Sequence, residues 1–187
     1  LDSVKIRDQL VDLTFSLKIS EHDKQYWPHD TEVKVLFTLG ETLSVSIVNQ
    51  NNADYAVSLT QALHTYFPVK DIHQLKASGF SQSKYIEFGE GPYKQPTDDV
   101  SFDKETDRVY TDLSLVQHLH TPEGTIEVSR ENSRSAVLWN PWIEKSTRLS
   151  RFKADDYLSM VCLEAANVLE DKVTLAAGEC HILTTHI

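Results

Sequence analysis

The sequence has few of the residues and segments that mark several large protein classes. It contains two cysteines, one methionine and six glycines. No apolar run approaches the roughly 20 residues that a membrane-spanning helix requires, and residues 1–10 mix charged and apolar side chains, unlike a signal peptide. The chain opens at Leu1, so a trimmed tag, a processed terminus and a missing N-terminal part all remain open. We expect a soluble globular protein.

The two cysteines, Cys162 and Cys180, each lie in an apolar stretch. This position is typical of buried free thiols in a reducing compartment, so we expect the protein to be cytoplasmic. A disulfide between the two remains possible. They lack the Cys-x-x-Cys spacing of many zinc sites, which argues against structural zinc.

Positive charge is scarce. Eighteen lysines and arginines stand against 28 aspartates and glutamates, for a formal net charge of −10. Nucleic acids and anionic membranes require basic surfaces, so we expect neither as a partner. A small anionic substrate remains compatible with this charge, because a few well-placed arginines or lysines suffice to bind one phosphate.

Apolar and polar residues alternate with a period of two along much of the chain, which predicts β-strands. Many short strands with turn signals and little helix predict an all-β, antiparallel sandwich or barrel. We expect residues 31–48 to form a hairpin, and 125–129 to pair with 135–139, with residues 89–99 as a loop. Further strands are expected at residues 11–19, 55–67, 72–77, 84–88, 107–113 and 179–187.

His64 lies near the end of the long strand expected at residues 55–67. One face of this strand is apolar, whereas the other is small and polar until it reaches His64 and Tyr66, as the floor of a concavity would be. Most histidines in such positions only form hydrogen bonds within a sheet. The alternative is an acid or base at the floor of a cleft, since imidazole exchanges protons near neutral pH.

Glu164 lies in the segment 157–169, whose composition fits either a helix or a buried strand. In a helix it would lie on the exposed side. In a strand it would share a face with Leu158, Met160 and Cys162, where a carboxylate is costly unless it is paired or used. Burial would then raise its pKa toward the range of a general base.

Three further residues are candidates for ligand binding. Asp107 and the adjacent Arg108 are compatible with a surface ion pair, or with an aspartate that accepts hydrogen bonds from sugar hydroxyls. Trp139 and Asn140, with Trp142 nearby, would suit either core packing or the binding of a polar, ring-shaped ligand.

No motif indicates a metal or nucleotide site. His118 and His120 would point to one side of a strand, but a lone pair of this kind is weak support for zinc, and we expect no metal. The sequence also lacks a glycine-rich phosphate loop, a Gly-x-Ser-x-Gly elbow and a dinucleotide fingerprint.

Several of these segments, in their order along the chain, resemble the hexose-6-phosphate 1-epimerases. This is the glucose-6-phosphate 1-epimerase branch of the galactose mutarotase superfamily. The matching segments are Ala62-Leu63-His64-Thr65-Tyr66-Phe67, Thr106-Asp107-Arg108-Val109-Tyr110, Trp139-Asn140-Pro141-Trp142 and Val161-Cys162-Leu163-Glu164, with Trp27-Pro28-His29-Asp30 before them.

The resemblance implies a large antiparallel β-sandwich with a concave, sugar-binding face, formed by residues 1–187 as one domain and corresponding to the C-terminal part of the family fold. It favours a strand over a helix at residues 157–166. The implied reaction interconverts the anomers of an aldohexose 6-phosphate, without metal or organic cofactor. Glu164 would act as general base and His64 as general acid.

In the same resemblance Asp107 would bind sugar hydroxyls, and Trp139 and Asn140 would complete the substrate site. Family members carry an N-terminal portion, with arginines that bind the phosphate, that has no counterpart among these residues. Without it, sheet edges and apolar surface would be exposed, so we expect self-association of this chain and a monomeric full-length protein. Two alternatives are an epimerase of unphosphorylated aldoses and a non-catalytic sugar-binding sandwich.

Overall fold

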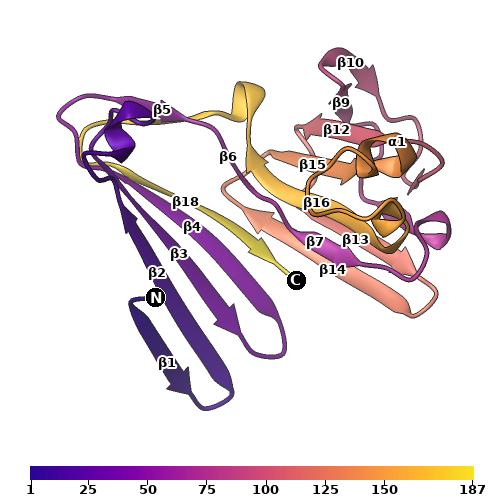
Figure 1. Cartoon of the computed structure of the whole chain (residues 1–187), viewed down its shortest axis with the longest axis horizontal. Helices are drawn as coiled ribbons and strands as arrows, with labels where there is room; N and C mark the ends of the chain where they lie inside the picture. The colour runs from indigo at the N-terminus through magenta and orange to yellow at the C-terminus, as the bar shows by residue number, and fades with distance from the viewer.

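The computed structural model describes residues 1–187 and is built almost entirely from antiparallel strands (Figure 1). The larger sheet contains, in spatial order, β1 (Ser3–Arg7), β2 (Leu10–Lys18), β3 (Thr31–Leu39), β4 (Leu43–Asn51), β18 (Cys180–His186), β14 (Gly124–Glu131), β13 (Val116–Thr121), β8 (Lys76–Ser78) and β11 (Val100–Ser101). The smaller sheet contains β10 (Glu90–Lys94), β9 (Lys84–Glu87), β12 (Thr106–Thr111), β15 (Ser135–Asn140), β16 (Met160–Asn167) and β6 (Gln61–Leu63), and β7 (Tyr66–Pro68) also pairs with β16.

The remaining elements are short. Strands β5 (Val57–Leu59) and β17 (Val173–Leu175) form a two-stranded sheet. The single α-helix is α1 (Trp142–Ser146), and the 3₁₀ turns are η1 (Asp23–Gln25), η2 (Ile72–Gln74), η3 (Asp156–Ser159) and η4 (Leu169–Asp171). None of these helices has the length and apolar character needed to cross a membrane.

The main core lies between the two sheets, which confirms the predicted β-sandwich. Strands β8, β13 and β14 of the larger sheet face β12, β15 and β16 of the smaller one. Because neighbouring residues of a strand point to opposite faces, one face of the smaller sheet is apolar and fills this core. The side chains that this face adds to the core, all fully or almost fully buried, are those of Tyr110, Ala136, Leu138, Val161 and Leu163.

From Met160 to Asn167 the segment that could have been a helix or a strand is strand β16, whereas residues 157–159 belong to the 3₁₀ turn η3. All eight residues of β16 are buried, and this strand pairs with β15 on one side and with β6 and β7 on the other. Val161 and Leu163 point into the core, so Cys162 and Glu164 point to the opposite face of the sheet. The expectation of a strand is confirmed, and the alternative of a helix is wrong.

The expectation of one long strand at residues 55–67 is wrong, although more buried and more exposed residues do alternate along this segment. The chain forms β5, β6 and β7, and β5 pairs with β17 rather than with the smaller sheet. Between β6 and β7 the amide of Thr65 donates to the carbonyl of Leu63 at 2.9 Å, which makes a tight turn at His64. A local break of this kind changes the direction of the His64 side chain, while strand pairing continues on either side of the turn.

Three other expectations need correction. Residues 72–77 begin with turn η2, because the side chain of Asp71 accepts a hydrogen bond from the amide of His73 and ends the extended backbone. The expected loop at residues 89–99 contains β10, which forms a hairpin with β9. Cys162 is buried as expected, but Cys180, at the start of β18, is exposed; both thiols are free.

Strands β14 and β15 do not pair with each other, contrary to expectation. β14 pairs with β13 and β18 in the larger sheet, whereas β15 pairs with β12 and β16 in the smaller one. The connection between them crosses from sheet to sheet, and the hydroxyl of Ser133 anchors it by donating to the carbonyl of Ala166. Sequence alternation indicated two strands but carried no information on their partners.

Strands β1–β4 extend away from the smaller sheet, as Figure 1 shows on the left. Their cross-strand rows include Phe15, Val35 and Ile47, and none of these three side chains is buried. Phe15 is 39% exposed and Leu17 is 56% exposed. This apolar face is the surface through which copies of the chain would associate; the self-association expected from the sequence stays a prediction.

The core between the sheets generates a prediction for stability. Leu138→Ala should lower the free energy of unfolding by about 3 kcal/mol, because it removes a fully buried side chain and leaves a cavity. Urea unfolding followed by circular dichroism measures this change. Leu115→Ala is the matched control, because Leu115 is 55% exposed, and it should change stability by less than about 0.5 kcal/mol. Equal losses in the two variants would contradict this account of the core.

Candidate active site

Two segments distant in the sequence bring His64 and Glu164 together. Glu164 projects from β16 on the face opposite the core, and His64 lies in the turn between β6 and β7, both of which pair with β16. Nε2 of His64 lies 3.3 Å from Oε1 of Glu164. The carboxylate side chain is only 6% exposed, whereas the imidazole is 49% exposed. The pair therefore joins a buried carboxyl group to an imidazole that solvent or a ligand can reach.

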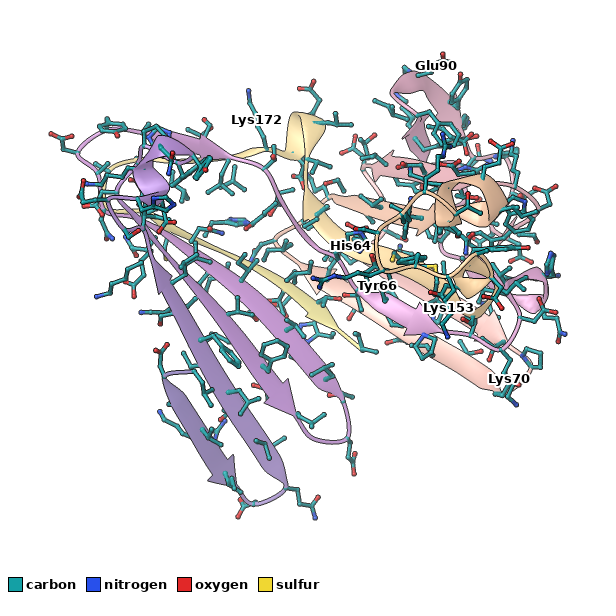
Figure 2. All side chains as sticks on the ribbon, viewed as in Figure 1. His64, Tyr66, Lys70, Glu90, Lys153 and Lys172 are labelled. Carbon is teal, nitrogen blue, oxygen red and sulfur yellow. The ribbon has the colours of Figure 1, made fainter.

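Aromatic rings hold the imidazole in place. The His64 ring stacks on Tyr66, with centroids 4.7 Å apart and an interplanar angle of 10°. The Trp139 ring is nearly perpendicular to the imidazole, with its centroid 5.8 Å from that of His64. Figure 2 shows His64 and Tyr66 side by side on the β6–β7 segment. Trp139 lies directly opposite Cys162 in the pairing of β15 with β16. The site is thus polar at the pair and apolar around it, a combination common in sites for small molecules.

Asp107 lies on the same face, one strand beyond Trp139 in register. Lys145, from helix α1, donates to Oδ2 of Asp107 at 3.3 Å and pairs with Glu105 at 3.1 Å. Its ammonium also lies 5.8 Å from the centre of the Trp139 ring. Sequence reasoning did not single out Lys145, because nothing in the pattern indicated helix α1.

Burial shifts the proton affinities of the pair in opposite directions. Loss of solvent and the nearby charge of Asp107 raise the pKa of Glu164 to about 7. Burial also lowers the pKa of His64. Burial disfavours the charged form of each group, so the shifts favour a protonated carboxyl group and a neutral imidazole. Between the lowered pKa of His64 and about pH 7, the two groups therefore hold mainly one proton, and it resides on Glu164.

Cys162 is the third titratable group at this place. It is fully buried, and burial together with the charge of Glu164 raises the pKa of its thiol. The sulfur, the imidazole nitrogen and the carboxylate oxygen all lie within 4.8 Å of one another. Donor atoms of kinds that bind transition metals thus converge here, a grouping that the sequence pattern did not reveal.

Asn140 is not brought to the pair. It is fully buried, its amide nitrogen donates to the carbonyls of Tyr157 and Met160 at 2.8 and 2.9 Å, and its side-chain oxygen accepts from the amide of Trp142. Every polar group of this side chain is therefore used by the backbone. Asn140 ties the start of α1 to the start of β16, and its place in the structure is one of support.

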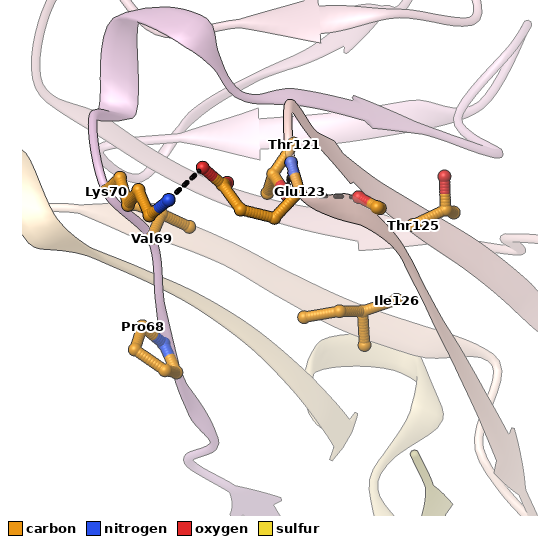
Figure 3. A pocket seen from close by; sticks show the side chains of 8 residues that line it. Pro68, Val69, Lys70, Thr121, Glu123, Thr125 and Ile126 are labelled. Carbon is orange, nitrogen blue, oxygen red and sulfur yellow. Dashed lines mark hydrogen bonds and ion pairs between the residues drawn. The ribbon is translucent and has the colours of Figure 1, made fainter.

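A separate cavity of about 460 Å³ lies between the end of β7 and the β13–β14 turn (Figure 3). An ion pair crosses it, with Nζ of Lys70 2.7 Å from Glu123. None of the predicted site residues lines this cavity. His64 and Glu164 therefore form the candidate site.

Comparison with known protein families agrees with the motifs and the fold. The sequence profile of the aldose 1-epimerase family matches residues 3–187. The chain belongs to the aldose 1-epimerase family. This finding confirms the resemblance expected from the ordered motifs.

Relatives extend the family assignment. Two proteins named "Putative glucose-6-phosphate 1-epimerase", from Cenchrus ciliaris and Escherichia coli, are 31% and 32% identical to this chain. The alignments cover 87% and 92% of this chain but 52% and 58% of the relatives. A crystal structure described as a "putative mutarotase" from Salmonella typhimurium matches all of this chain and 62% of its own, with TM-score 0.88 and 27% identity. The chain thus spans a little over half the length of these epimerase-family proteins.

Because the pKa of Glu164 is raised, replacing this residue with an uncharged one should stabilise the protein by an amount that depends on pH. The native state binds this proton more tightly than the unfolded state, so its contribution is present below pH 4.5 and is lost as the pH rises to about 7. Glu164→Gln, which carries no charge, should gain about 3 kcal/mol relative to wild type across that window. Urea unfolding at several pH values from 4 to 8 measures the difference.

The matched control for this measurement is Glu41→Gln, which removes one exposed carboxylate and makes the same change in net charge. A stability difference between Glu164→Gln and wild type that stays constant from acid to neutral pH would show that Glu164 is not desolvated as described.

Proposed function

We propose that the protein interconverts the α and β anomers of an aldohexose 6-phosphate by acid–base ring opening and closure. The observation that carries the proposal is the pairing of His64 with the buried Glu164 at 3.3 Å, with one proton between them near neutral pH. Membership of the aldose 1-epimerase family and the names of the relatives support the reaction class and the phosphorylated substrate.

In the proposed mechanism the carboxylate of Glu164 takes the proton from the C1 hydroxyl while the imidazolium of His64 protonates the ring oxygen. The bond between C1 and the ring oxygen breaks, and the sugar opens to its aldehyde. Rotation about C1–C2 presents the other face of the aldehyde. In ring closure the roles reverse: His64 takes the proton of the C5 hydroxyl, and Glu164 returns its proton to the C1 oxygen, which yields the other anomer. Overall the pair gains and loses no proton.

The reactive form has the proton on His64 and the carboxylate ionised. Because burial raises the pKa of Glu164 and lowers that of His64, this form is the minor one in the free protein. A sugar hydroxyl that donates to the carboxylate would stabilise the ionised form and shift the proton to the imidazole. Substrate binding and activation of the pair are therefore linked in this proposal.

The neighbouring residues have supporting roles. Asp107, oriented by Lys145, would accept hydrogen bonds from sugar hydroxyls. The indole of Trp139 would cover an apolar face of the ring, and Asn140 would hold the backbone from which these side chains project.

Action on an unphosphorylated aldose is the second candidate. One observation favours it: Lys145, a cation at this face, is already paired with Glu105 and Asp107, so it is not free to bind a phosphate. The support for a phosphorylated substrate comes from the names of the relatives, and that for anomer exchange comes from the pair itself.

The decisive experiment measures anomer exchange by NMR for glucose 6-phosphate and for galactose. His64→Ala and Glu164→Gln should each lower kcat by about 100-fold or more, the usual cost of losing a general acid or base. His73→Ala is the matched control, since His73 is an exposed histidine on the neighbouring turn η2, and it should leave the rate unchanged. Exchange in both site variants as fast as in wild type would contradict the mechanism. Faster exchange of galactose than of glucose 6-phosphate would favour the second candidate.

The shared proton also predicts a bell-shaped pH profile. Above about pH 7 the pair loses its proton and the acid is absent; in acid, below the lowered pKa of His64, both groups are protonated and the base is absent. We therefore expect kcat/KM to reach its maximum slightly below pH 7. Exchange rates measured from pH 4 to 9, corrected for the uncatalysed reaction, check this expectation. A rate that keeps rising to pH 9 would contradict it.

A further inference from the structure

We propose that His64, Cys162 and Glu164 form a binding site for one zinc ion, and that zinc inhibits the protein by engaging both proton-transfer residues. The binding part of this proposal stands on the structure alone. The inhibition part rests on the proposed function, because it requires that His64 and Glu164 transfer protons.

The spacing of the donor atoms fits zinc. Tetrahedral zinc binds sulfur at about 2.3 Å, and imidazole nitrogen and carboxylate oxygen at about 2.0–2.2 Å, so neighbouring donors lie about 3.2–3.7 Å apart. Nε2 of His64 and Oε1 of Glu164 are already 3.3 Å apart. All three donors lie within 4.8 Å of one another. Small rotations of side chains therefore suffice, and the backbone need not move.

The backbone of the site is firmly held, but the site is open on one side. Cys162 and Glu164 belong to β16, which has strands on both sides, and their side chains are buried. The half-exposed His64, stacked on Tyr66, closes the set from the solvent side. Three protein ligands in a site open to solvent leave a fourth coordination position for water, as in catalytic zinc sites.

The kinds of donor select among metals. A thiolate, an imidazole and a carboxylate suit zinc and cobalt(II), whereas magnesium and calcium prefer sites made of oxygen alone. The charges also fit, because a thiolate and a carboxylate together neutralise a divalent ion. Formation of the zinc–sulfur bond releases the thiol proton to solvent, and Glu164 releases its own proton where it carries one.

Cys162 has no part in the proposed proton transfer, and this separates zinc binding from catalysis. Loss of its sulfur removes one metal ligand but leaves both proton-transfer residues. A bound zinc, in contrast, occupies the imidazole nitrogen and the carboxylate oxygen with which the sugar would react. Zinc and sugar should therefore compete for the same pair.

Cobalt(II) tests the site without any measurement of activity, because thiolate ligation produces an intense charge-transfer band in the near ultraviolet. We expect the band in the wild-type protein and its loss in Cys162→Ser. Cys180→Ser is the matched control, since Cys180 is the other free thiol and is exposed; it should retain the band. Zinc should displace cobalt from the wild type and abolish the band.

The affinity for zinc, measured by competition with a chromophoric chelator, should fall about 100-fold or more in Cys162→Ser and in His64→Ala, because loss of a ligand costs at least as much as loss of an outer-shell partner. The His64→Ala variant keeps the test valid if Cys162→Ser, a substitution at a buried position, fails to fold, because His64 is half-exposed. Equal zinc affinity in wild type and in either variant, or a cobalt band that survives in Cys162→Ser, would overturn the site.

The inhibition is tested by anomer exchange with and without zinc, each variant compared with its own zinc-free rate. Wild type should lose activity in proportion to occupancy, and Cys162→Ser should need about 100-fold more zinc for the same fractional loss. Full activity of the zinc-loaded wild type would contradict the proposed inhibition but not the proposed zinc site. Binding of cobalt by a protein that exchanges no anomers would instead contradict the proposed function and leave the metal site supported.

Discussion

The burial of one carboxylate, that of Glu164, is the constraint on which the rest of the site depends. An ionised carboxylate in such a place costs free energy, and the raised pKa of this group, about 7, expresses that cost. The fold maintains it because β16 is buried along its whole length and bonded to strands on both sides. A strand held in this way cannot turn its acid toward solvent, so the acid keeps its proton affinity near neutrality.

The same strand joins stability to chemistry. Val161 and Leu163 fill the core between the sheets. Cys162 and Glu164 alternate with them along the strand and belong to the candidate site on the opposite face. A shift of one residue in register would exchange these two sets. The core therefore sets the position of the carboxyl group of Glu164, and the turn at His64 adds the imidazole without breaking the pairing of β6 and β7 with the same strand.

Sequence reasoning was most successful where a feature is local. The period-two pattern correctly indicated the hairpin of β3 and β4 and the strand β18, since alternation is a property of neighbouring residues. It was wrong about the partner of β14 and about the continuity of residues 55–67, because pairing is decided by distant strands. The motif around Asn140 was conspicuous, yet the structure uses that amide for the backbone, a role that composition alone does not reveal.

The sequence by itself determined the two-faced strands, the acidic character of the chain and the presence of His64, Glu164, Asp107 and Trp139 in ordered motifs. Only the tertiary structure decided that the first two residues lie 3.3 Å apart, that Cys162 joins them and that Lys145 holds Asp107. The physical reason is that distances between strands and the loss of solvent around a charge depend on residues far apart in the chain. Their effect on a pKa exists only once those residues have packed together.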